Sequence, residues 1–217
     1  MLRYDEFRTR ARPSEPYPDY MGRGFSKLSI RLSYILARTS VTPNQVTLLS
    51  TVVAFLAAAI IRSPTYWMRL AGVVVWFIGY ILDLCDGDIA RYRSMKSEFG
   101  HWFEAVSDRA KDLALLAAVT ALAFSQVRAS WVIWAGCLAV GGTLLHSYTI
   151  TYGFKATKPF QPSPLAKFGQ IHYVLMAAFV ILNLVPIYLV IVSVTSLGAV
   201  ALNVYSTWKA SSPRTGQ

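Results

Sequence analysis

The sequence is poor in charged residues and in cysteine. Only 15% of its 217 residues are charged, against about 25% in soluble domains. Its two cysteines, Cys85 and Cys137, have no CxxC spacing, so we expect small buried hydrophobic side chains and no disulfide. The first 22 residues contain no apolar core, which argues against a signal peptide. The basic residues form no dense run on a soluble module, so the net charge of +10 favours anionic lipid over nucleic acid as the partner.

Apolar residues are what the sequence has in excess. They make up 54% of the chain, and the mean hydropathy is +0.42. A bilayer span needs about 20 mostly apolar residues. We predict an all-α integral membrane protein with six transmembrane helices, the last two separated by a reversal at Asn183 and Pro186. The expected spans are 43–61, 67–88, 99–126, 129–154 and two within 168–208.

The loop charges predict the orientation. Eight Lys and Arg residues precede the first span, and others follow at 91–96, 155–167 and 209–214. The opposite loops hold only Arg62 and Arg128, so both termini and the turn after Asp86 should be cytosolic. The expected organisation is a partly disordered cytosolic tail (1–21), an interfacial amphipathic helix (22–40), the membrane domain (41–209) and a cytosolic tail (210–217). A plasma membrane fits this arrangement best.

The acidic residues are concentrated in one segment. Of eleven, seven lie between Asp83 and Asp112, and none follows. A carboxylate at membrane depth costs a few kcal/mol, so this group needs compensating charge. Salt bridges to Arg91, Arg109 and Lys111 would account for one or two of the acids.

The spacing of these acids predicts that they face one another. Asp83 and Asp86 are three residues apart, and Glu104, Asp108 and Asp112 are spaced by four. The short turn at 92–98 would make their helices antiparallel neighbours. Oxygen ligands without His or Cys suit hard divalent ions. The segment therefore indicates a metal site at the cytosolic end of two spans.

The same segment, DLCDGDIARYRSMKSEFGHWFEAVSD, resembles the signature of the CDP-alcohol phosphatidyltransferase family, D-x2-D-G-x2-A-R-x8-G-x3-D-x3-D. Seven of its eight fixed positions match, and Glu104 stands where the family has its third aspartate. Residues 42–47, TPNQVT, are similar to a P-N-x-x-T segment of the family. The six spans and the preceding interfacial helix agree with the family's architecture.

The resemblance implies a reaction and roles for the matching residues. A phospho-alcohol group, most simply phosphatidyl from CDP-diacylglycerol, would pass to an acceptor hydroxyl and CMP would leave. One or two Mg²⁺ or Mn²⁺ ions would be held by Asp83, Asp86, Glu104 and Asp108, with Asp108 also the general base. The nucleotide site would comprise Asn44, Thr47, Asp83, Gly87, Ala90, Arg91 and Gly100. The family also often forms homodimers.

The acceptor is not specified by the sequence. A phosphorylated polyol would need extra cations or polar groups, for which the candidates are Arg109, Lys111, His146, Lys155 and Lys158. Positive-inside loop charge is the favoured explanation for the two last lysines, and an interhelical hydrogen bond is the favoured explanation for His146. Asp112 is expected to orient Arg109 or a water, and Asp88 to be a solvated charge facing elsewhere.

Two other classes of function remain open at this stage. Intramembrane carboxylates also mark ion paths, so a cation transporter or channel is an alternative. Transporters, however, tend to place such groups near mid-membrane within a repeated fold, and no repeat is visible here. The Glu104 departure would also suit a catalytically silent family member that acts as an interaction protein.

Overall fold

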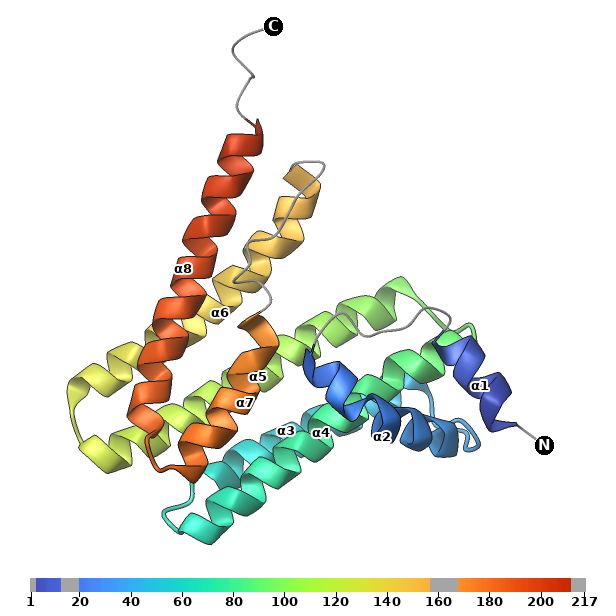
Figure 1. The fold of residues 1–217 in the computed structure, drawn as a ribbon, viewed down its shortest axis with the longest axis horizontal. Helices are drawn as coiled ribbons and strands as arrows, with labels where there is room; N and C mark the ends of the chain where they lie inside the picture. The colour runs from blue at the N-terminus through green and yellow to red at the C-terminus, as the bar shows by residue number, and fades with distance from the viewer. Residues whose placement is uncertain (1–2, 13–19, 157–167, 212–217) are drawn as a thin grey trace, which may run out of the picture. The chain divides into compact units, whose positions relative to one another are not determined.

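The protein is all-helical throughout the described residues. The computed structural model describes residues 3–12, 20–156 and 168–211, without side chains at 20–23, 154–156 and 168–170. This confirms the predicted fold class. The helices, shown in Figure 1, are α1 (Tyr4–Ala11), α2 (Tyr20–Leu36), α3 (Pro43–Ile61), α4 (Tyr66–Tyr92), α5 (Glu98–Val127), α6 (Ser130–Ala156), α7 (Phe168–Ile181) and α8 (Val185–Ser211).

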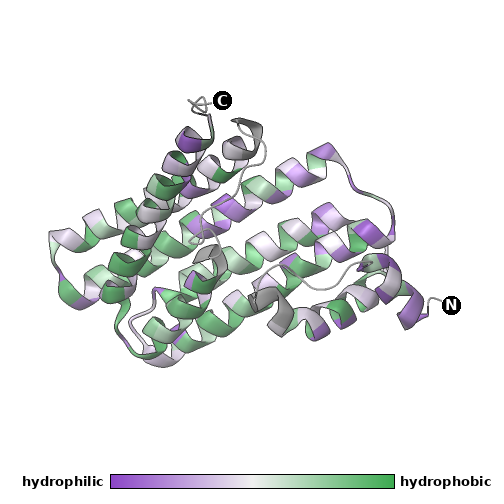
Figure 2. Ribbon diagram, turned by 45° about the horizontal axis from the view of Figure 1, so that its top comes forward, coloured by the Kyte–Doolittle hydropathy of each residue, from purple (hydrophilic) through white to green (hydrophobic). Residues whose placement is uncertain are grey.

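Five of these helices are long and apolar enough to cross a membrane: α3, α4, α5, α6 and α8. Their bounds lie within a few residues of the predicted spans. The apolar part of α7 described by the structure, Ile171–Ile181, is shorter than a bilayer span. Figure 2 shows apolar residues along much of α3 and α8 and polar ones gathered on α1. The predicted count of six spans therefore remains a prediction.

Three of the helix connections contain a non-glycine residue with positive φ: Ser94, Arg128 and Asn183. Asparagine tolerates this left-handed conformation better than most residues. The side-chain oxygen of Asn183 also accepts a hydrogen bond of 2.7 Å from Nε2 of Gln126. The predicted reversal at Asn183 is confirmed.

The chain forms two compact units, Met1–Leu115 and Leu116–Gln217. In the first, α3 and α4 lie side by side (Figure 1). α3 begins with a capping box, in which Thr42 and Gln45 exchange side-chain and backbone hydrogen bonds ahead of Pro43. At Gly72 a Cβ atom would stand 2.7 Å from the backbone nitrogen of Ile61. The two backbones can therefore approach closely only because this residue has no side chain.

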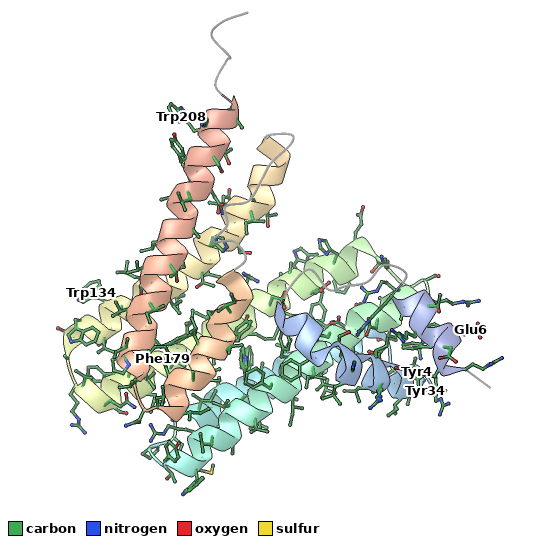
Figure 3. All side chains as sticks on the ribbon, viewed as in Figure 1. Tyr4, Glu6, Tyr34, Trp134, Phe179 and Trp208 are labelled. Atoms are coloured by element: carbon green, nitrogen blue, oxygen red, sulfur yellow. The ribbon has the colours of Figure 1, made fainter. Side chains whose placement is uncertain are left out.

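Helices α1 and α2 pack on α4. Phe7 and Ala11 of α1 and Ile30 of α2 are buried together, with Tyr34 and Tyr92 against them. Figure 3 shows Tyr4 beside Tyr34, with ring centroids 5.2 Å apart. The prediction of a partly disordered tail at 1–21 did not foresee this helix, because one buried Phe among polar residues gives little periodic signal.

The larger apolar residues of α2, which was predicted to be an interfacial amphipathic helix, have two different surroundings in the structure. Leu32 and Leu36 pack against a buried cluster of α3 and α4, whereas Leu28 and Ile35 are exposed. Ser29 and Ser33 are fully buried. Part of α2 is therefore a packing surface for the protein, and the exposed leucine and isoleucine are what remain for the predicted contact with lipid.

In the second unit, α6 and α8 lie side by side. Ser193 donates a hydrogen bond of 2.7 Å to the carbonyl oxygen of Ala135, and a Cβ atom at Gly142 would clash with Ser196. Small residues thus bring these helices close, as is common in membranes. Cys85 is buried as expected, but Cys137 is exposed on α6, which corrects its prediction. Trp134 and Trp208 point outward (Figure 3).

Candidate active site

The ends of three helices surround a polar pocket of about 330 Å³ in the first unit. The beginning of α3, the end of α4 and the turn into α5 all contribute residues. Of the positions predicted to bind nucleotide or metal, eight line this pocket: Asn44, Thr47, Asp86, Gly87, Ala90, Arg91, Gly100 and Glu104. The structure therefore brings together residues that lie up to 60 positions apart in the sequence.

Two glycines make room along the pocket wall. A Cβ atom at Gly87 would lie 3.2 Å from Nη1 of Arg91, and one at Gly100 would lie 3.3 Å from Oδ1 of Asn44. Both distances are tighter than ordinary van der Waals contacts. The absent side chains therefore let Arg91 and Asn44 lie flat against the backbone, facing the pocket.

The two α4 acids are held by hydroxyls of α3. Oγ1 of Thr47 donates a 2.5 Å hydrogen bond to Oδ2 of Asp86, and Oγ of Ser50 donates one of 3.2 Å to Oδ1 of Asp83. These bonds fix the orientation of both carboxylates. Thr47 was predicted as a nucleotide-site residue, and the structure adds that it orients a predicted metal ligand.

Lys111 joins the predicted metal ligands of two helices. Its Nζ lies 2.5 Å from Oδ1 of Asp83 on α4 and 2.8 Å from Oδ1 of Asp108 on α5. The Lys111 side chain is only 9% exposed. Lys111, predicted as an acceptor-binding residue, is thus the counter-charge of the acidic cluster, a role that was also considered for it.

The donor set fits a hard divalent ion in chemical type, since all four predicted ligands are carboxylates. Asp86 and Glu104 line the pocket, while Asp83 and Asp108 share Lys111. Among the described residues, no three acidic, His or Cys side chains converge in a metal-binding geometry. A lysine between two of the carboxylates is evidence that this position attracts positive charge. The assignment of ligands stays a prediction.

The remaining acids of the segment are paired. Asp112 lies 3.4 Å from Nη1 of Arg109, as expected. Asp88 is fully buried and bonded to Arg12, Arg91 and Ser33. The expectation of a solvated Asp88 was therefore wrong. Sequence spacing gave no sign that the N-terminal segment would cover this position.

The other acceptor candidates lie elsewhere. His146 is in the second unit, where Nδ1 lies 3.4 Å from Nδ2 of Asn203, in line with an interhelical hydrogen bond. Lys158 and the side chain of Lys155 fall outside the described residues. None of these observations tests their predicted role.

Five residues that line the pocket were not among the predicted site residues: Pro43, Met95, Lys96, Ser97 and His101. Pro43 lies in the 42–47 segment, and the other four lie within the signature segment, between Arg91 and Glu104. A position between two halves of the motif was a usable signal for these four. Lys96 and His101 add cationic or hydrogen-bonding groups to the rim of the pocket.

The described helices define an integral membrane protein, with a pocket walled by carboxylates, an arginine and glycines at the ends of three of them. The family comparison agrees with this class. The chain belongs to the CDP-alcohol phosphatidyltransferase family, whose model matches residues 40–206.

Curated relatives are similar over parts of the chain. A bifunctional IPC transferase and DIPP synthase of Aquifex aeolicus is 27% identical over 84% of this chain and 42% of that protein. The phosphatidylinositol phosphate synthase of Mycobacteroides abscessus is 34% identical over 43% of this chain and 41% of that protein. The archaetidylinositol phosphate synthase of Pyrococcus horikoshii is 29% identical over 56% and 58%. The matches thus span less than two thirds of each relative's length.

Solved structures share the fold. The phosphatidylinositol phosphate synthase of Mycobacterium tuberculosis with CDP-DAG bound has a TM-score of 0.70 and 16% identity, covering 88% of this chain and all of that one. The same protein in complex with manganese and citrate gives 0.67 and 17%, covering 87% and 93%. At this level of identity the likeness establishes the arrangement of helices.

Proposed function

We propose that this protein transfers a substituted phosphate group from a membrane-bound CDP-alcohol to an acceptor hydroxyl and releases CMP. The observation that carries the proposal is the pocket itself, where eight of the predicted donor and metal residues line one 330 Å³ cavity. CDP-diacylglycerol is the donor to test first, because the M. tuberculosis structural relative was solved with CDP-DAG bound.

The pocket residues suit a nucleotide diphosphate. Arg91 supplies a guanidinium cation, whose Nη1 nitrogen can donate to a phosphate oxygen. Gly87 and Gly100 have no side chain, so a ligand can approach the helix backbone at these two positions. The side-chain amide of Asn44 offers both a donor and an acceptor for a base or ribose. Lys96 at the rim adds a second cation for the diphosphate.

Asp108 is the proposed general base. It lies on α5 with its side chain 36% exposed, so one oxygen can face an incoming hydroxyl while the other pairs with Lys111. Asp108 takes the proton as the acceptor oxygen attacks the β-phosphorus of the CDP-alcohol. The bond from that phosphorus to the CMP oxygen breaks, and CMP carries away the electron pair.

A divalent ion held by Asp83, Asp86, Glu104 and Asp108 would neutralise charge on the diphosphate as it is cleaved. The manganese complex of the structural relative supports divalent metal use. Thr47 and Ser50 donate hydrogen bonds to the two α4 carboxylates, which supports a fixed position for both groups. Mg²⁺ and Mn²⁺ are both candidates.

A phosphorylated inositol is the acceptor to test first, because two of the relatives are named for synthesis of inositol phosphate lipids. Arg109 is 38% exposed beside Asp112 and could meet such a phosphate. Loop charges support an orientation with the pocket on the cytosolic side. The plasma membrane is the proposed location. A homodimer is also proposed.

The test is an assay of CMP release from purified protein. CDP-diacylglycerol and Mg²⁺ or Mn²⁺ would be incubated with inositol phosphate, glycerol phosphate, serine and unphosphorylated polyols in turn. We expect CMP release that requires both the metal and one of these acceptors. Absence of CMP with every CDP-alcohol tried, together with metal-driven ion flux in liposomes, would refute the proposal in favour of a transporter.

Replacing Glu104 by Asp tests whether the departure from the family signature preserves the metal site. Glu104 lines the pocket beside Asp86, so a shorter carboxylate there keeps the charge and restores the family residue. We expect Glu104→Asp to keep or raise the rate of CMP release, and Glu104→Gln to lower it at least tenfold. Loss of activity in Glu104→Asp would mean that the site has been rebuilt around the longer side chain.

A further inference from the structure

Arg12 and Asp88 connect the N-terminal helix to the pocket. Asp88 is 0% exposed, although it carries a charge and lies near the end of α4. Nε and Nη2 of Arg12 donate to its two oxygens at 2.9 and 2.5 Å, and Nη2 of Arg91 donates to Oδ1 at 2.7 Å. Oγ of Ser33 completes the set at 2.8 Å. One carboxylate thus joins α1, α2 and α4.

Arg12 itself is held by α2. Its Nη1 donates to the carbonyl oxygen and to Oγ of Ser26 at 2.9 and 2.7 Å, and its Nη2 donates to Oγ of Ser29 at 2.9 Å. Only 6% of the Arg12 side chain is exposed. The guanidinium is therefore fixed on both sides, and so is the carboxylate that it contacts.

Arg91 is the pocket residue that this network reaches. Nη2 is occupied by Asp88, and Nε donates a 2.5 Å hydrogen bond to the carbonyl oxygen of Ala11, the last residue of α1. Among the described residues, no hydrogen bond uses Nη1, which lies over Gly87 in the pocket wall. One edge of the guanidinium is thus anchored while one nitrogen faces the cavity.

We propose that Arg12 and Asp88 are positioning residues, which hold Arg91 in the orientation that receives the donor's diphosphate, and that α1 is therefore part of the nucleotide site. Arg12 lies outside the region matched by the family model, 40–206, so this element is not part of that match. The inference rests on the proposed function, since it assigns the phosphate contact to Arg91.

A purely stabilising ion pair is the competing explanation. Removing one partner of a buried ion pair destabilises a protein whether or not the pair positions a ligand-binding group, so a lower melting temperature alone does not separate the two explanations. An arginine side chain also has many rotamers, and fixing one in advance removes that entropy loss from binding. The expected consequence is therefore on donor affinity, beyond any effect on the melting temperature.

The experiment compares Arg12→Gln with Glu6→Gln in the full chain. Glu6 lies on the same helix (Figure 3), in an exposed pair with Arg10, and is not among the residues that line the pocket. For Arg12→Gln we expect the KM for CDP-diacylglycerol to rise about tenfold, with kcat and the acceptor KM changed by less than about twofold. Arg12→Lys should recover part of the affinity, and Glu6→Gln should match the wild type.

A double-mutant cycle separates positioning from packing. If Arg12 acts through Arg91, adding Arg12→Gln to Arg91→Gln will raise the donor KM no further, whereas independent effects would multiply. An unchanged donor KM in a folded Arg12→Gln protein, or multiplied effects in the double variant, would overturn the inference alone. A wild-type protein that releases no CMP from any CDP-alcohol would overturn the proposed function and this inference with it.

Discussion

Asp108→Asn is expected to reduce the rate of CMP release by about a thousandfold or more while leaving the protein folded. The amide cannot accept the acceptor's proton, and general bases contribute about 10²–10⁴ in rate. It also removes one predicted metal ligand. Because Lys111 keeps its 2.5 Å contact with Asp83, the helices should stay paired. The measurement is kcat at saturating donor and acceptor.

Glu98→Gln provides the matched control. Glu98 lies in the first turn of the same helix, is exposed, and is not among the residues that line the pocket. The same change from carboxylate to amide should there leave kcat near that of the wild type. If Asp108→Asn retained more than a tenth of the wild-type rate, another group would have to be the base.

Lys111→Met is expected to make the protein's stability depend on a divalent metal. The substitution keeps an unbranched side chain but leaves Asp83 and Asp108 without the cation between them. Removing one partner of a buried pair costs about 3–5 kcal/mol, and the 36% exposure of Asp108 should reduce this to about 2. In EDTA the melting temperature of Lys111→Met should lie about 5 °C below that of the wild type.

Mn²⁺ should reduce the difference in melting temperature between Lys111→Met and the wild type, because an ion bound by the same carboxylates replaces the missing charge. Lys27→Met, which removes an exposed lysine of α2, should melt like the wild type with and without metal. An unchanged melting temperature for Lys111→Met in EDTA would show that Lys111 does not compensate these acids. An undiminished difference in Mn²⁺ would show that the ion binds elsewhere.

The predictions agree with the structure where the sequence has long apolar runs or a motif with fixed spacing. The bounds of α3 to α6 and the reversal at Asn183 followed from apolar runs broken by turn residues. Eight of the pocket residues on α3, α4 and α5 were named from the signature and the preceding Thr42–Thr47 segment. The missed residues Lys96 and His101 lie between fixed motif positions, where the signature is silent.

The predictions failed where a partner far away in the sequence decides whether a residue is buried or exposed. Asp88 was expected in solvent because its neighbours in sequence gave no reason for burial, and Arg12 is 76 positions away. The exposed Cys137 and the two different surroundings of the larger apolar residues of α2 are similar cases. In each, the outcome depends on which helix packs against the residue.

By itself the sequence determined the helical membrane class, the approximate bounds of α3 to α6 and the family, since apolar run length and short-range spacing are local properties of the chain. Only the tertiary structure decided how the charges are compensated. It placed Lys111 between Asp83 and Asp108, and Arg12 on Asp88 beside Arg91. The physical reason is that a buried charge takes whichever partner the packing brings within hydrogen-bonding distance, and packing joins residues far apart in sequence.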